Sequence, residues 1–400
     1  MNRSSATRSI LNRRTFLKRT GAGALVLALG GSTYRAVDQG VFASGQGEAY
    51  ESWREWHAQP EPGPLRLVQS AILAANPHNT QPWLFRVREG SVELFANTQR
   101  HLGAMDPFLR EMHLGLGCAL ENMMLTARAE GCEVKLSLEP DTLTGPSRAE
   151  TFVKVATLNL SPAEREPSPL YDAIPTRHTD RSSYAPQEVE GEELEEMRAL
   201  TGADTKLFLF EQGSAFDLFA EETIKATETI ISDEVMSHDS HAWFDKNWRE
   251  VQRDKDGPFI DTSGVSPLLR AAVKMLPPTS PQMLDDGWLG GTQTSLAATP
   301  VLGLLAVRDL YDKPQTLNAG RVWQRLHLWM SANGLAAQPV NQMLEVVDRQ
   351  RQLEQREQMA EILDGLTGNP AWRPTFAFRL GYPNTDVLPS ARRPVSEVLT

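Results

Sequence analysis

Residues 76–83 read Asn-Pro-His-Asn-Thr-Gln-Pro-Trp, and this stretch guides our interpretation of the whole chain. Two prolines, Pro77 and Pro82, fix the backbone on both sides of the polar side chains. The carboxamides of Asn79 and Gln81 offer donors and acceptors that suit the edge of a flat heterocycle. An Asx-turn ahead of a strand would use the same residue types. The stretch therefore predicts either a binding loop or an ordinary turn before an apolar strand.

Hydrophobic periodicity predicts helices alternating with short strands on both sides of this loop. Helices are expected at 65–75, 108–130, 191–200, 214–231, 316–333 and 342–364, and strands at 83–87, 92–95, 133–138, 152–158, 205–210, 300–308 and 374–381. Residues 44–64 are rich in Gly, Gln, Glu and Pro and are expected to form a linker or arm. Residues 232–292 are expected to be irregular, and a segment of this length often forms a lid.

Two of the predicted helices have similar sequences. Each contributes to a stretch that begins and ends with glycines 14 positions apart, Gly117 to Gly131 in one and Gly320 to Gly334 in the other. A leucine and an alanine of the first helix recur in the second, 203 positions further along the chain, as the glycines do. Apolar helices that end in glycine are common, so chance is one explanation. A duplicated core helix is the other.

The charge balance excludes one class of partner. The formal charge is −11, and residues 1–43 hold seven Lys/Arg and one Asp, so subtracting their +6 leaves about −17 for the rest. Nucleic-acid binding requires basic patches, so we expect no nucleic-acid partner. Local arginine clusters in such an acidic chain become candidate anion sites.

The N-terminal residues predict export. Six basic residues and no acid precede an apolar run at 21–31, as in a signal peptide, and the run is too short to span a bilayer. Arg13-Arg14-Thr-Phe-Leu-Lys18 resembles the twin-arginine signal, whose export machinery transports folded proteins and is then an expected partner. Cleavage after Ala43 or a tethered, uncleaved form would place the protein in the periplasm or on the outer face of the inner membrane.

Cysteine and histidine spacing does not indicate a metal site. Cys118 and Cys132 lie outside any CxxC motif, so we expect a buried Cys118 thiol, while an exported location would permit a disulfide. His238 and His241 lack a third ligand in sequence. A Rossmann G-x-G-x-x-G motif after a strand is also missing from the sequence.

Four segments in order resemble the nitroreductase superfamily of FMN-binding proteins, in particular its single-chain, duplicated Acg-like branch. They are residues 76–83, the run Ile174-Pro-Thr-Arg177-His-Thr179-Asp-Arg181, the helix from Gly320 with Gln338-Pro339 after it, and Arg379-Leu-Gly-Tyr-Pro383 with Ser390-Ala-Arg392-Arg393-Pro394. Ordinary members are homodimers with FMN at the interface.

The resemblance implies an α+β, nitroreductase-like fold with antiparallel-rich central sheets flanked by helices, duplicated as a pseudo-dimer within one chain. The expected units are a signal at 1–43, a linker at 44–64, a first half at 65–160 and a second half at 170–395 that includes the lid at about 232–292. A monomer is expected because the family interface would be internal. The arginine-containing run opens only the second half, which implies a single FMN site.

The resemblance also assigns candidate FMN-binding residues. The phosphate would contact Arg177, Thr179, Arg392 and Arg393, and Arg181 would lie near flavin N1 and O2. The polyol and pyrimidine edge would contact Pro77, His78, Asn79 and Gln81. Gln338 and Pro339 would lie beside flavin N5, where Pro339 cannot donate a backbone N–H. The sequence identifies no catalytic side chain, because the cofactor carries the redox step.

Two functions follow from this assignment. One is an FMN-dependent oxidoreductase that reduces a planar acceptor, such as a nitroaromatic or a quinone, with an electron donor that the sequence does not identify. The other is an exported FMN-binding or FMN-sequestering protein whose lid, with Trp243, Trp248 and Trp288, closes the site. The oxidoreductase is the leading interpretation, but an exported protein lacks NAD(P)H, so either a membrane or protein donor replaces it or the protein does not turn over.

Overall fold

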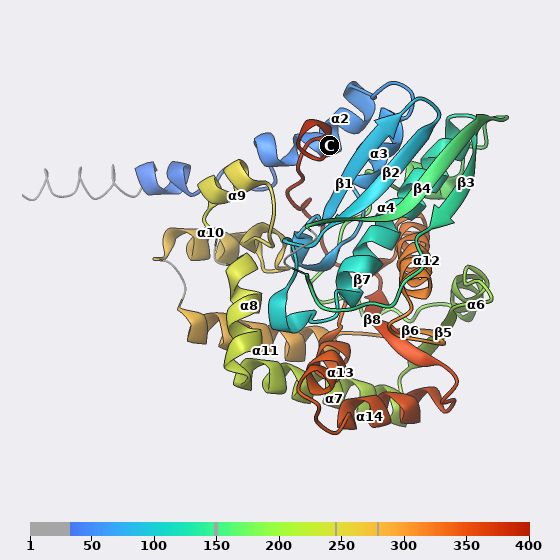
Figure 1. Cartoon of the computed structure of the whole chain (residues 1–400). Helices are drawn as coiled ribbons and strands as arrows, with labels where there is room; N and C mark the ends of the chain where they lie inside the picture. The colour runs from blue at the N-terminus through green and yellow to red at the C-terminus, as the bar shows by residue number, and fades with distance from the viewer. Residues whose placement is uncertain (1–32, 148–150, 245, 278–279) are drawn as a thin grey trace, which may run out of the picture.

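The computed structural model describes residues 33–147, 151–244, 246–277 and 280–400 (Figure 1). The twin-arginine motif and the apolar run of the predicted signal lie outside the described residues. No helix in the described ranges combines the length and apolar character needed to cross a bilayer.

Two four-stranded antiparallel sheets share one topology. The first has the order β1-β2-β4-β3 and the second has the order β5-β6-β8-β7, so corresponding strands occupy corresponding positions. In each sheet the register shifts once between the two central strands. This agreement confirms the predicted α+β class with antiparallel sheets and supports the duplication. The strands are β1 (Trp83–Arg88), β2 (Ser91–Asn97), β3 (Cys132–Leu138), β4 (Phe152–Pro162), β5 (Lys206–Glu211), β6 (Val301–Val307), β7 (Ala336–Pro339) and β8 (Arg373–Gly381).

Two long helices join the halves at the centre of the molecule (Figure 1). They are α4 (Arg110–Ala129) and α12 (Lys313–Ala332), and each lies between the second and third strands of its half in chain order. They meet at the two glycines of the repeated sequence: a Cβ on Gly117 would lie 2.1 Å from the Leu317 carbonyl oxygen, and one on Gly320 would lie 2.0 Å from the Leu114 carbonyl oxygen. Equivalent residues in mutual contact mark a pseudo-two-fold axis.

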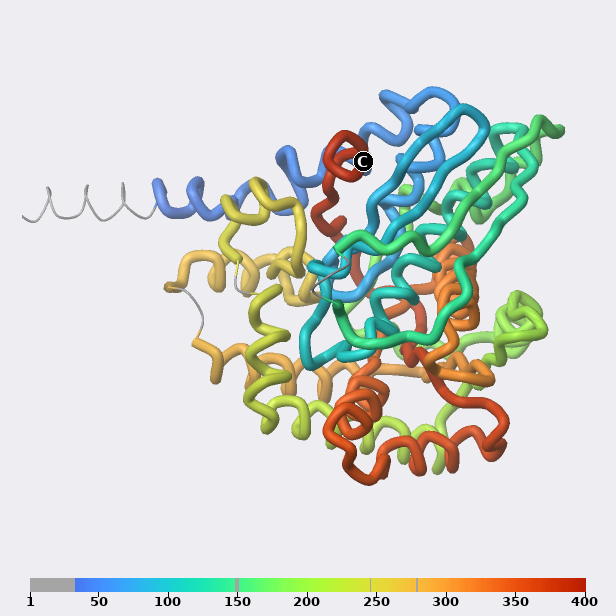
Figure 2. Tube along the Cα trace, viewed as in Figure 1, coloured from blue at the N-terminus to red at the C-terminus, as the bar shows by residue number. Residues whose placement is uncertain are grey.

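The C-terminal segment returns from the second half to the first. Figure 2 shows it running beside the first-half strands. The Phe85 N–H donates to the Val398 carbonyl at 2.8 Å, and the Thr400 N–H donates to the Phe85 carbonyl at 2.9 Å. This crossing brings the arginines at 392–393 close to the 76–83 loop. The short helices of the first half are η1 (Glu48–Tyr50), α2 (Glu51–Ala58), α3 (Leu65–Ala71), η2 (Pro77–Asn79) and η3 (Gly103–Met105), and η5 (Val395–Glu397) ends the chain.

The second half contains two helical insertions that the first half lacks. In the described residues, five α-helices and the short 3-10 helix η4 separate β5 from β6, and two α-helices separate β7 from β8. The expectation of irregular structure at 232–292 and of one helix at 342–364 was therefore wrong. The second-half helices besides α12 are α5 (Pro169–Asp172), α6 (Gly191–Ala199), α7 (Ser214–Ser232), α8 (Glu234–Phe244), α9 (Trp248–Asp254), η4 (Ile260–Thr262), α10 (Pro267–Met275), α11 (Pro281–Ala297), α13 (Gln342–Gln352) and α14 (Gln358–Thr367).

The expected linker at 44–64 is instead packed against the core. Helix α2 buries Trp53 and Trp56. The guanidinium of Arg66 stacks on the Trp56 ring at 3.7 Å and donates to the Trp56 carbonyl at 2.9 Å. The two tryptophans therefore hold this segment against the first half, where a flexible arm was expected.

Candidate functional site

A cavity of about 200 Å³ lies between the two halves. The first half contributes the 75–79 loop and one side of α4, and the second half contributes the segments at 177–181, 338–345 and 388–392. Nine of the eleven residues singled out from the sequence line it. They are Pro77, His78, Asn79, Arg177, Thr179, Arg181, Gln338, Pro339 and Arg392.

The 76–83 loop holds an unusual backbone conformation. His78, Asn79 and Gln81 have φ values of 45°, 51° and 49°, in the left-handed region that non-glycine residues adopt at a cost. The Asn76 carboxamide stabilises the bend, because its Oδ1 accepts the Gln81 N–H at 2.8 Å. This bond spans five residues, so it differs from the expected Asx-turn, in which the side chain bonds the backbone two residues on. The bend forms part of the cavity wall.

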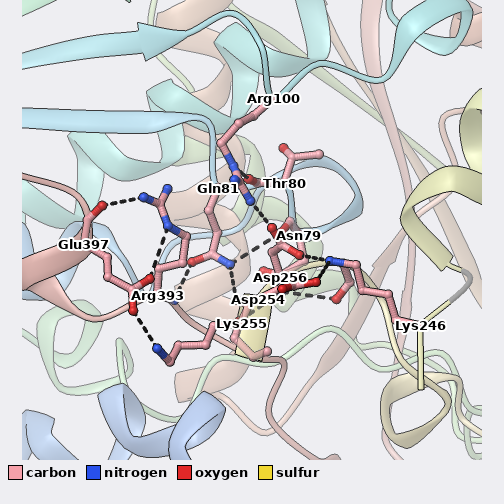
Figure 3. Close-up of polar contacts among 12 residues, drawn as sticks. Asn79, Thr80, Gln81, Arg100, Lys246, Asp254, Lys255, Asp256, Arg393 and Glu397 are labelled. Atoms are coloured by element: carbon pink, nitrogen blue, oxygen red, sulfur yellow. Dashed lines mark hydrogen bonds and ion pairs between the residues drawn. The ribbon is translucent and has the colours of Figure 1, made fainter. Parts of the chain in front are cut away.

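The two carboxamides of the loop have different positions (Figure 3). Gln81 is buried away from the cavity: its Nε2 donates to the Lys255 carbonyl at 2.7 Å, and its Oε1 accepts the Arg393 N–H at 2.8 Å. Asn79 lines the cavity, but its Nδ2 donates to the Ala391 carbonyl at 2.9 Å. Both side chains therefore join the loop to the C-terminal segment, and Gln81 also joins it to the segment after α9.

Adjacent arginines near the C-terminus face opposite ways. Arg393 turns away from the cavity and pairs with Glu397 (Figure 3), so the structure does not bring it to the site as expected. Arg392 is buried on the cavity wall, and its Nη1 donates to Asn79 Oδ1 at 2.5 Å. One arginine of the pair is thus available to a ligand.

Arg177 and Arg392 form a buried cationic end of the cavity. Each is 2% exposed, and the Nε of each has no hydrogen-bond partner. Burial lowers the pKa of Arg177 to about 10, and burial together with Arg177 lowers the pKa of Arg392 well below its usual value. No ion pair with a carboxylate involves either residue within the described ranges. Two buried like charges without a counter-ion favour an anionic ligand.

Histidines beside these arginines are held neutral. Burial, then Arg177 and Arg392, lower the pKa of His178 to about 3. Burial and the nearby Arg181 lower the pKa of His78 to about 4. Arg181 itself donates from Nη1 to the Thr262 carbonyl at 3.1 Å, so its position depends on the lid segment. Uncharged imidazoles next to guanidinium groups keep the positive charge on the arginines.

The Gln338-Pro339 segment ends β7 at the cavity wall. Gln338 Oε1 accepts Arg379 Nε at 2.6 Å, which fixes the side chain. Helix α13 begins three residues later, and Asn341 and Gln342 line the cavity. The first N–H groups of a helix lack intrahelical acceptors. The start of α13 therefore provides backbone donors next to Pro339, which has none.

Sequence reasoning missed several cavity residues. Among them are two carboxyl groups, Glu111 and Glu345, and the aromatic Phe244 of helix α8, whereas Trp288 of α11 lines the cavity as expected. A charged residue on the apolar face of a predicted helix was the available signal for Glu111. Trp243 and Trp248, expected above the site, do not line the cavity; Trp243 packs on Arg100.

The fold and cavity define a duplicated α+β protein with a cavity lined by residues of both halves. No family model matches the chain. A candidate NAD(P)H nitroreductase of Mycobacterium tuberculosis H37Rv, Rv3131, is 27% identical over 350 residues, covering 85% of this chain and 92% of that protein. The candidate NAD(P)H nitroreductase acg of the same organism is 32% identical over 121 residues, 30% of this chain and 34% of that protein.

Solved structures also align with this chain. One is the FMN-dependent nitroreductase NfnB from Mycobacterium smegmatis in complex with NADPH, with a TM-score of 0.37 and 18% identity over 57% of this chain and 96% of that chain. Another is a candidate nitroreductase in complex with FMN from Desulfovibrio desulfuricans, with a TM-score of 0.32 and 14% identity. That alignment covers 58% of this chain and 96% of the other. By sequence, the chain is similar over 85% of its length to a protein named as an NAD(P)H nitroreductase.

Proposed function

We propose that this chain binds FMN in the inter-half cavity and is an oxidoreductase of nitroreductase type. The observation that carries the proposal is the pair Arg177 and Arg392, buried and without a carboxylate partner at one end of the cavity. A phosphate dianion is the natural partner of two converging guanidinium groups. The sequence relatives named as NAD(P)H nitroreductases point to the same chemistry.

The residues present fit the parts of FMN. Arg177 and Arg392 would hold the phosphate, with the Ser390 side chain beside them on the cavity wall. The loop at His78 and Asn79 and the start of α13 provide polar groups for the rest of the molecule. When bound, the flavin supplies two-electron transfer, which we propose passes to a nitroaromatic or quinone-like acceptor from NAD(P)H or another donor.

A comparison of FMN with riboflavin tests the proposal, because riboflavin lacks the phosphate. We expect Arg177→Gln to weaken FMN binding by about 10- to 100-fold, equivalent to ~1.5–3 kcal/mol for a hydrogen bond to a charged group, and to leave riboflavin binding unchanged. Arg54→Gln, at an arginine whose side chain is 54% exposed, is the control. Failure of the wild-type protein to bind FMN in a fluorescence titration would refute the proposal.

A sequestering role is the second candidate, and the lid favours it. Phe244 of α8 and Trp288 of α11 line the cavity, and the Phe244 ring contacts the His78 ring edge-on at 5.2 Å. The volume of about 200 Å³ is below the ~300–1,000 Å³ usual for small-molecule sites, so the lid must move outward to admit a mononucleotide. Phe244→Ala and Trp288→Ala should then accelerate FMN release and acceptor reduction, whereas Phe152→Ala on the exposed part of β4 should not. Rapid turnover by the unmodified protein would exclude this role.

We also propose export by the twin-arginine route, on the basis of the Arg13-Arg14 motif. Replacing both arginines with lysine should retain the protein in the cytoplasm, as measured by cell fractionation. Unchanged export of that variant would contradict the proposal. An exported protein without NAD(P)H would need another electron donor, or it would store FMN.

A further inference from the structure

Two glutamates line the cavity, and one carboxylate oxygen of each has no hydrogen-bond partner among the described residues. Glu111 comes from the first turn of α4 and Glu345 from the first turns of α13, and they are 4% and 5% exposed. Oε1 of Glu111 and Oε2 of Glu345 are buried and lack a hydrogen-bond donor. Gln342 Oε1, on the same wall, also lacks a donor. Three unsatisfied acceptors at one wall of a cavity indicate that a donor belongs there.

The neighbouring charged groups do not donate a hydrogen bond to these carboxyls. Arg110 is the nearby cation: its Nε donates to Asp348 Oδ2 at 2.8 Å and its Nη1 donates to the Thr375 carbonyl, while its Nη2 lies 2.8 Å from Asp348 Oδ2 as an ion pair without a hydrogen bond. Asp348 also accepts the Tyr311 hydroxyl at 2.8 Å. Asp106 accepts the backbone N–H groups of Glu111 and Met112. The unpartnered carboxyls are therefore the two that face the cavity.

Charge balance requires a proton at this site. Asp106, Glu111, Glu345 and Asp348 would carry four negative charges against one positive charge on Arg110, all of them buried. Burial in low dielectric and mutual repulsion disfavour full ionisation. The pKa of Glu345 is raised to about 8 by burial and by the charges of Asp106 and Asp348, although Arg110 acts in the opposite direction. The pKa of Glu111 is raised well above its usual value by burial and by the charge of Glu345. At neutral pH the pair holds at least one proton.

The pair lies at the opposite end of the α4 face from the arginines. Glu111, Leu114, Gly115 and Cys118 line the cavity along one stripe of the helix, and Arg177 acts electrostatically on the Cys118 thiol. Seven helical positions separate Glu111 from Cys118, a rise of about 10 Å at ~1.5 Å per residue. A ligand whose phosphate contacts the arginines can thus extend toward the carboxyls.

We propose that Glu111 and Glu345 form a proton-donating pair for the acceptor reduced in this cavity, a role that rests on the proposed function. A quinone that receives a hydride from reduced FMN needs one further proton to become a neutral hydroquinone. One carboxyl O–H bond breaks, an O–H bond forms on the acceptor oxygen, and the carboxylate left behind regains its proton from water. A nearby carboxylic acid is suited to this transfer when its pKa lies close to neutrality.

The first test needs neither cofactor nor turnover. Infrared spectra of the cofactor-free proteins are recorded at neutral pH, and the spectrum of the double variant Glu111→Gln/Glu345→Gln is subtracted from that of the wild type. The difference should contain a carboxylic acid C=O band from the wild type. Glu361→Gln, at a glutamate whose side chain is 57% exposed, should retain the band. Retention of the band by the double variant would show that the proton lies elsewhere and overturn the proposal.

The second test separates the two half-reactions. Stopped-flow mixing of dithionite-reduced, FMN-loaded protein with benzoquinone should be slowed about 10²-fold by Glu345→Gln, the lower range for loss of a general acid, while reduction by dithionite is unchanged. The slowed rate should also lose its dependence on pH. Equal oxidation rates in wild type and variant would overturn the proposal. Absence of FMN binding would refute the proposed function itself, and the donor role with it, whatever the infrared result.

Discussion

At the residue scale, Arg177 and Arg392 combine burial with unneutralised charge, and an anion should relieve that cost. Inorganic phosphate at ten times its dissociation constant should stabilise the folded protein by about 1.4 kcal/mol. Arg177→Gln should abolish most of the resulting rise in Tm, measured by differential scanning fluorimetry, and Arg54→Gln should keep it. An equal rise in all three proteins would show that phosphate acts elsewhere.

Glu345 should leave a signature in the pH dependence of stability. Its folded pKa of about 8 lies above its ordinary value of 4.5, so the folded state holds a proton that the unfolded state releases in this interval. The free energy of unfolding should therefore fall as pH rises from 4.5 toward about 8, and Glu345→Gln should reduce that slope. His178 contributes a slope of the opposite sign over an overlapping range, because its pKa, lowered to about 3, makes stability fall as pH drops from 6.5 toward 3. Urea unfolding at several pH values measures both slopes, and parallel curves for wild type and variant would contradict the assignment.

The sequence alone could identify the residue types of the site better than their directions. Arg392 and Arg393 are adjacent residues of the same type, yet Arg392 faces the cavity and Arg393 faces Glu397. Gln81 matches the motif but satisfies the backbone of Lys255 and Arg393. The direction of Gln81 depends on partners 174 and 312 residues away in sequence, which no local pattern encodes.

At the element scale, the crossing of α4 and α12 depends on two glycines. Gly117→Ala or Gly320→Ala would place a methyl group about 2 Å from a backbone carbonyl oxygen of the other helix, which has no flexible side chain to yield. We expect each to destabilise the fold by at least ~1–3 kcal/mol, the usual cost of overpacking. Gly287→Ala in α11 meets nothing within 4 Å and should stabilise by ~0.5–1 kcal/mol. Similar unfolding free energies for all three variants would refute this crossing.

Element prediction succeeded where periodicity was long and failed where short helices were read as loops. The central helices and seven of the eight strands in the described residues were predicted from their apolar patterns. The exception is β7 (Ala336–Pro339), whose four residues are too few to show a period. In the lid, Ser266-Pro267 and Ser280-Pro281 are helix starts, with serine as N-cap and proline at the first helical position. The prediction of irregular structure at 232–292 treated these prolines as helix breakers, but at the first helical position proline favours a helix.

At the scale of the whole molecule, the duplication places a dimer-like interface inside one chain. The central core cluster includes residues of α4 and α12 and of both sheets, so neither half buries its apolar surface alone. We therefore expect a monomer in sedimentation velocity, since the surface that pairs the halves is already covered. An obligate dimer would contradict this expectation.

A divided chain tests the same idea more directly. Residues 163–167, between β4 and α5, are exposed, so a break there removes little packing. Fragments 33–164 and 165–400, co-expressed, should assemble into a soluble 1:1 complex, because α4 and α12 restore the interface without a covalent link. Expressed separately, each fragment should aggregate, since Trp323, Leu114 and their neighbours would face water. Gly320→Ala in the second fragment should prevent assembly, whereas Gly287→Ala should not. A first fragment that folds alone would show that the halves are independent domains and that the cavity between them is not set by a shared core.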